Sequence, residues 1–133
     1  MNERGFVVFD AGELRLGLPE AAVVTVLDWS PPHPLPGGAE WLWGLLPGEA
    51  GVVPVLREEL FGGSRATPEV LIVVELSGRV LAFPGRGPRL QRAVMEAAPP
   101  QAALWCEGVV AGDPAIRCVD LARLYRGLRI GIE

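Results

Sequence analysis

Short apolar runs separated by tight-turn signals dominate the first part of the chain. Residues 6–9 form a compact apolar run, and residues 13–18 alternate polar and apolar side chains, as a half-buried strand does. Between them lies Ala11-Gly12, a two-residue turn of the kind that sets the register of a β-hairpin. The pattern predicts that the chain opens with such a hairpin.

The same pattern recurs in the second half of the chain. Residues 70–76 and 79–83 flank Ser77-Gly78, which follows the first turn at an offset of about 65 positions. The Gly-apolar-apolar triplets at 44–46 and 108–110 repeat at nearly the same offset. This repetition predicts two approximate lobes, residues 1–66 and 67–133, each a small barrel of about five short strands that removes its own edges by closure, with strand or helix exchange between the lobes left open.

Two segments have helical patterns. Asp120 is a suitable N-cap for a short C-terminal helix, because the apolar residues that follow it are spaced three, four and seven positions apart. Residues 88–98 also fit a helix that begins at Pro88, with Leu90 and Ala93 on one face. We therefore expect a mostly β protein with a helix at its C-terminal end and a second helix over residues 88–98.

Composition and charge narrow the function classes. Half of the residues are apolar, which disfavours disorder, and the net charge of −4 disfavours nucleic acid as a partner. All basic residues are arginine, so mechanisms that need a phosphate-binding or Schiff-base lysine are excluded. The apolar run that follows Met1 is too short for a membrane span or a secretory signal, so we expect a cytoplasmic protein without direct membrane insertion.

Few residues offer a catalytic or metal site. Ser64 lies in a segment that resembles a nucleophile elbow but ends in Ala66 in place of glycine, and His33 is the one histidine. Cys106 and Cys118 lack metal-ligand spacing, so we expect buried apolar side chains, with a disulfide as the alternative. The sequence indicates no cofactor, no metal and no convergent catalytic set.

The four tryptophans are candidates for either core packing or an interface hot spot. Trp29, Trp41 and Trp43 cluster around a proline-rich segment, and Trp105 stands alone. Tryptophan contributes large contact areas in both settings. Trp41 and Trp43 are therefore included among the candidate docking residues.

Read in order, the motifs resemble the CheW-like adaptor family of bacterial chemotaxis and related signalling arrays, over nearly the whole chain. They are residues 6–19, residues 23–27, Pro34-Leu35-Pro36-Gly37, Gly44-Leu45-Leu46, Val52-Val53-Pro54-Val55, the hairpin around Gly78, and residues 108–121. The resemblance implies two five-stranded SH3-like barrels that share a core. It also implies a non-enzymatic coupling protein that joins the cytoplasmic tip of a chemoreceptor to the regulatory domain of a histidine kinase.

The sequence departs from the family pattern at three docking positions. Glu49 replaces an arginine of the family's Asn-Leu-Arg-Gly motif, and Thr25 stands in a strand that often carries an acid. Arg57-Glu58 replaces the usual Asp-Leu. Charge changes of this kind alter partner choice more than fold, which favours a divergent adaptor in a specialised chemotaxis or pilus-motility array. The candidate protein-binding residues are Val23, Thr25, Trp41, Trp43, Glu49, Arg57 and Glu58.

Two alternatives remain open from the sequence. The chain could be a degenerate structural subunit that associates with itself. It could also be a small serine hydrolase that uses Ser64 and His33.

Overall fold

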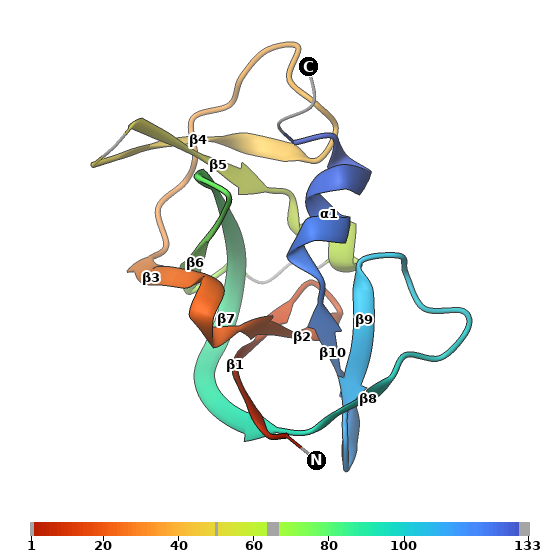
Figure 1. The fold of residues 1–133 in the computed structure, drawn as a ribbon. Helices are drawn as coiled ribbons and strands as arrows, with labels where there is room; N and C mark the ends of the chain where they lie inside the picture. The colour runs from red at the N-terminus through yellow and green to blue at the C-terminus, as the bar shows by residue number, and fades with distance from the viewer. Residues whose placement is uncertain (1, 50, 64–66, 131–133) are drawn as a thin grey trace.

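The computed structural model describes residues 2–49, 51–63 and 67–130, which form ten strands and a short α-helix (Figure 1). The expectation of a mostly β protein with a C-terminal helix is confirmed. The elements are β1 (Arg4–Ala11), β2 (Leu14–Pro19), β3 (Val23–Asp28), β4 (Leu42–Gly48), β5 (Gly51–Leu56), β6 (Val70–Leu76), β7 (Arg79–Ala93), β8 (Met95–Ala97), β9 (Cys106–Val110), β10 (Asp113–Val119) and α1 (Leu121–Leu128), with 3-10 turns at Glu20–Ala22 and Glu58–Phe61.

The long strand β7 joins two SH3-like barrels. Its first half pairs antiparallel with β6, and its second half pairs antiparallel with β1. We call barrel A the unit of β1, β2, β8, β9, β10 and residues 86–93, and barrel B the unit of β3, β4, β5, β6 and residues 79–85. The strand order along the continuous sheet is β3-β6-β7-β1-β2-β10-β9-β8.

The two barrels exchange strands across the approximate boundary at residue 66. Barrel A takes β1 and β2 from the start of the chain and β8 to β10 from its end, while barrel B is built from the middle. The reason lies in β7, which is 15 residues long and passes from one barrel to the other. The two similar hairpins therefore differ in their connections: β1–β2 lies wholly in barrel A, whereas the second strand of β6–β7 continues from barrel B into barrel A.

The helix expected over residues 88–98 is wrong. Residues 86–93 continue β7 and pair with β1, because that pairing buries Ala93 in barrel A. Pro88 lies where the β1–β7 register shifts between Val8 and Asp10, a position at which a missing N–H costs little.

The turns of the two hairpins are well defined. Ala11 pairs with Leu14, so the first turn is Gly12-Glu13, one residue later than predicted. The second turn is Ser77-Gly78 as predicted, and both residues have positive φ, as a type I′ turn requires.

Strands β1 and β6 contain continuous apolar runs, without alternating polar residues, because both faces of each strand are buried. In β6, Leu71 and Val73 face the interior of barrel B, while Ile72 and Val74 face a central core between the barrels. In β1, Phe6 and Val8 pack inside barrel A and Phe9 faces the central core. A strand that is covered on both sides has no need of polar positions.

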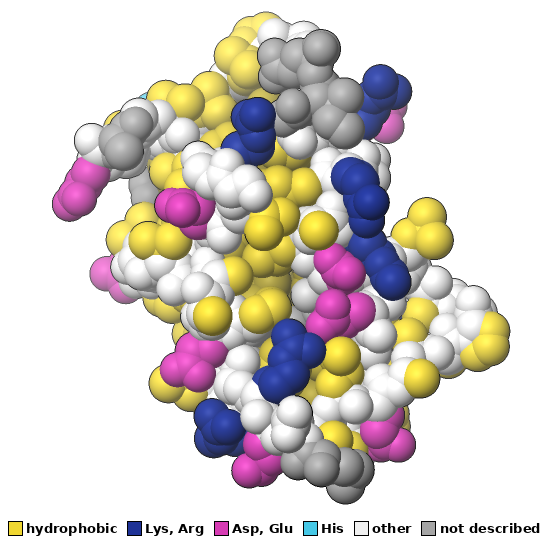
Figure 2. All heavy atoms as spheres, viewed as in Figure 1, with side chains coloured by type: hydrophobic (Ala, Val, Ile, Leu, Met, Phe, Trp, Pro, Cys, Tyr) yellow, Lys and Arg dark blue, Asp and Glu magenta, His cyan; other side chains and the backbone are white. Residues whose placement is uncertain are grey.

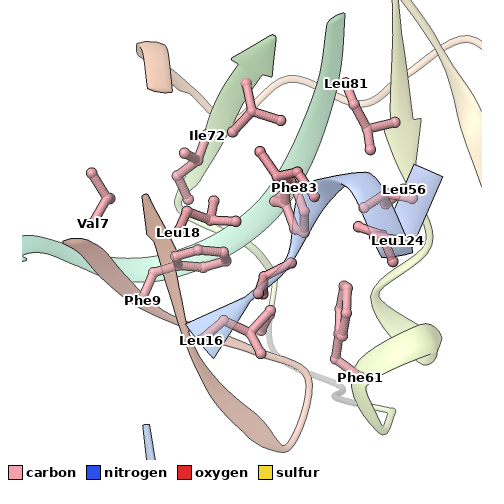
Figure 3. Packing of buried hydrophobic residues seen from close by; sticks show 14 of the residues in the cluster. Val7, Phe9, Leu16, Leu18, Leu56, Phe61, Ile72, Leu81, Phe83 and Leu124 are labelled. Carbon is pink, nitrogen blue, oxygen red and sulfur yellow. The ribbon is translucent and has the colours of Figure 1, made fainter. Parts of the chain in front are cut away.

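The central core is shared by both barrels and by α1 (Figure 3). Phe83 of β7 lies at its middle, edge-on to Phe9 with ring centroids 6.0 Å apart and stacked on Phe61 at 5.9 Å. Trp105 meets Phe61 edge-to-face at 5.5 Å. The implied shared core is therefore confirmed, with one layer of aromatic rings between the two barrels.

Helix α1 covers one end of this core. The Asp120 side chain accepts a hydrogen bond from the Arg123 backbone N–H at 3.1 Å, so the expected N-cap is confirmed. Leu121, Leu124 and Tyr125 are buried in the central core. The Tyr125 hydroxyl donates to the Arg79 carbonyl at 2.9 Å and fixes the helix to the β6–β7 hairpin.

Both cysteines are buried and free, as the first of the two expectations stated. Burial raises the pKa of the Cys118 thiol to about 11 and that of the Tyr125 hydroxyl to about 12, since both ionised forms would lose hydration. Cys118 is therefore a protonated, apolar part of the core of barrel A at neutral pH.

We expect the protein to lose stability in alkali before its arginines titrate. The folded-state pKa values of Cys118 and Tyr125 lie above their ordinary values of 9.0 and 10.0, so the unfolded chain releases these protons first as pH rises. The free energy of unfolding should be flat with respect to these groups below pH 9 and should fall between pH 9 and 12. Urea unfolding across this range measures it, with Tyr125→Phe expected to flatten the upper part of the curve. An equally steep fall in that variant would contradict the assignment to Tyr125.

Candidate docking surfaces

The first candidate surface is an apolar groove between the barrels, which we call the interbarrel groove. It has a volume of about 400 Å³. Its lining residues are Val7, Glu20, Val23, Val26, Pro88, Arg89 and Leu90. Strands β3 and β7 therefore form its two sides, with β1 between them.

The groove continues onto an exposed apolar edge. Strand β3 lies at the end of the strand order, and Val24 and Val26 are 59% and 42% exposed. Leu90, across the groove, is 69% exposed. Exposed apolar side chains gathered at a sheet edge are typical of a protein interaction site.

The structure brings only part of the predicted set to this groove. Val23 lines it, half-buried, and Thr25 lies exposed on the same strand. Val26 and Leu90 were missed by the sequence analysis. The mostly apolar sequence of β3 gives no indication that its second face is open, and the helical pattern of residues 88–98 places Leu90 on a helix.

The second candidate surface is a groove beside the helix, which we call the α1 groove. Trp41 and Arg57 both line it, and the Arg57 N–H donates to the Trp41 carbonyl at 2.8 Å. The structure therefore joins two predicted docking residues that are separated by the β4–β5 hairpin in the sequence.

The remaining tryptophans are half-buried and pack against the cores. Trp43 lies against Trp29 with ring centroids 5.0 Å apart, and both cover the core of barrel B. Trp105 belongs to the edge of the central core. Core packing is thus the structural setting of these three, whereas Trp41 both touches the central core and lines a groove.

Glu49 and Glu58 have opposite settings. Glu49 is exposed at the tip of the β4–β5 hairpin, next to a third, smaller cavity of about 280 Å³ between that hairpin and β3. Glu58 is only 4% exposed, so its assignment as a docking residue needs correction: no partner can reach it directly. It accepts a hydrogen bond from the Gly12 N–H at 2.8 Å and forms an ion pair with Arg86. Glu58 therefore links barrel B to the first hairpin and to the crossing point of β7.

The structure does not describe a catalytic site formed by His33 and Ser64. His33 is exposed, and its backbone pairs with Leu45. Ser64 lies outside the described residues. In the described part of the chain, no group of His, Cys, Asp or Glu side chains could hold a metal ion, and no helix is a candidate to span a membrane.

Two barrels that share one core and carry apolar grooves on their surfaces form a scaffold for binding other proteins. The family model described as the CheW-like domain matches residues 5–111. The chain therefore belongs to the CheW-like family, and it is a scaffold or adaptor domain rather than an enzyme. The resemblance inferred from the sequence is confirmed.

A solved structure has a similar fold. It is that of the scaffolding protein TtCheW from Thermoanaerobacter tengcongensis, with a TM-score of 0.75, 20% sequence identity and coverage of 90% of each chain. At 20% sequence identity, the match shows that the two chains share a fold. A comparison with curated proteins gives no match.

The buried ion pair predicts an asymmetric response to substitution. Glu58→Gln should lower the free energy of unfolding by about 3 kcal/mol, because the nearly buried Glu58 carboxylate would no longer offset the charge of the partly buried Arg86. Glu58→Gln combined with Arg86→Met should cost less than the single variant. Denaturant unfolding of both, with the exposed Glu59→Gln as the matched control, measures the difference. A single variant as stable as that control would show that the pair does not hold this region together.

Proposed function

We propose that this chain couples a chemoreceptor to a histidine kinase in the cytoplasm, with the receptor tip bound in the interbarrel groove. The observation that carries the proposal is the exposed apolar lining shared by β3 and the second half of β7. Family membership supports a scaffold, and the groove supplies a concave apolar surface for a partner's helices.

The charged residues of the interbarrel groove are suited to distinguishing one partner protein from another. Glu20 and Arg89 line it together with its apolar residues. Burial of Val26 and Leu90 would supply affinity, while these two charges at the rim would fix the orientation of the bound helices.

The kinase regulatory domain is proposed to dock on barrel B, where β3 and the β4–β5 hairpin come together. The small cavity between them is lined by Leu27, Leu46 and Val53 and can receive an apolar side chain. Thr25 and Glu49 are exposed beside it. Because Glu49 stands where the family usually has arginine, the complementary kinase surface should carry a positive charge. This supports a partner in a specialised array, of chemotaxis or pilus-motility type.

A single substitution separates the two docking sites. Leu90→Asp should weaken binding of a purified chemoreceptor cytoplasmic fragment from the same source at least tenfold, because a carboxylate would be desolvated in the groove. Binding of the kinase regulatory domain should stay within twofold. Isothermal titration with each partner gives both values.

Leu104→Asp is the matched control, since Leu104 is 88% exposed in the segment between β8 and β9 and lines none of the three cavities described above. It should leave both affinities unchanged. If the unsubstituted protein binds neither partner at micromolar concentration, the coupling role is refuted. If it forms a stable homo-oligomer instead, a self-associating structural subunit takes its place.

A further inference from the structure

The α1 groove is a second, larger surface hollow, lined by the end of α1, the β6–β7 turn, β5 and the residues that precede β4. It has a volume of about 990 Å³. Its apolar lining consists of Trp41, Val52, Pro54, Val80, Leu128 and Ile130. In Figure 2 a column of hydrophobic side chains runs down this face, with arginine side chains on both sides of its upper part.

Three arginines line the groove: Arg57, Arg79 and Arg129. None of them forms a side-chain ion pair with another described residue. Two acids, Glu40 and Glu59, also line it, so the lining has a positive excess in a chain whose net charge is −4. Unpaired guanidinium groups beside apolar surface are suited to carboxylates that flank an apolar face.

Arg129 has a backbone conformation that is unusual for a residue other than glycine. It ends α1 in the left-handed conformation, with φ 61° and ψ 32°, where glycine is strongly preferred. The Arg129 N–H donates to the Arg126 carbonyl at 3.1 Å and the Ile130 N–H to the Tyr125 carbonyl at 2.8 Å, which are the two bonds of a Schellman motif. A side chain kept at a strained position in a surface groove points to a role for that side chain.

The backbone around the groove disfavours a bound strand. Strand β5 pairs with β7 only between Val55 and Ala82. Pro54, which precedes Val55 and lines the groove, has no backbone N–H to donate to a bound strand. A partner would therefore contact side chains rather than extend a ladder. Amphipathic helices bind apolar grooves in this way.

We propose that the α1 groove binds an acidic amphipathic helix of a partner protein, with its apolar face on Trp41 and Leu128 and its carboxylates on the three arginines. The site shares no lining residue with the interbarrel groove. It does not depend on receptor binding there.

The test uses a synthetic helical peptide of about 16 residues, with leucine on one face and glutamate on the flanks. A second peptide carries lysine in place of every glutamate. Titration followed by NMR should show the Trp41 indole and the Arg79 and Arg129 amides shifting with the acidic peptide. The lysine peptide should bind at least tenfold more weakly.

Arg129→Gly distinguishes a binding role from a structural one. Glycine relieves the backbone strain, so the thermal midpoint should rise, while affinity for the acidic peptide should fall at least fivefold. Arg92→Ala removes one positive charge from the exposed surface of barrel A, where Arg92 lines neither groove, and is the matched control, with unchanged affinity expected.

The proposal would be overturned by equal binding of the two peptides, by full affinity in Arg129→Gly, or by peptide-induced shifts confined to Val26 and Leu90. A Trp41 signal that shifts with protein concentration alone would also overturn it, since a second copy of the chain would then fill the groove.

Discussion

The packing of Phe83 between Phe9 and Phe61 is the contact on which the rest of the structure depends. Phe83 lies on β7, the strand that belongs to both barrels, while Phe9 comes from barrel A and Phe61 from the 3-10 turn between β5 and β6 of barrel B. Each barrel encloses only a small core of its own. The central core is larger than either, so most of the apolar burial that stabilises one barrel requires the presence of the other.

This shared core explains how a small protein can hold separate surfaces in a fixed relation. The interbarrel groove exists because β7 carries Leu90 past the edge of β3, and the α1 groove exists because Tyr125 ties the helix to the β6–β7 hairpin. The ion pair between buried Glu58 and partly buried Arg86 fixes the crossing point between the barrels. A scaffold that must hold two proteins at a set distance needs this rigidity more than it needs a reactive group.

The sequence predicted the local features that depend on neighbours in the chain. The hairpin at Ser77-Gly78, the Asp120 cap and the buried cysteines follow from turn chemistry, capping and apolar character. The failures concern long-range pairing. Residues 86–93 fit a helical pattern, and only β1, far away in the sequence, makes them a strand. Glu58 resembled a surface acid because its partner Arg86 is distant in the chain, and Leu90 gained its place in a groove only through the path of β7.

Native-state hydrogen exchange tests the central claim, that the two barrels are one cooperative unit held by the Phe83 layer. Amides of β6 in barrel B and of β10 in barrel A should exchange with the same free energy of opening, and Phe83→Ala should lower both by the same amount, about 3–5 kcal/mol. Free energies that differ between β6 and β10, or a loss confined to one barrel in Phe83→Ala, would contradict it.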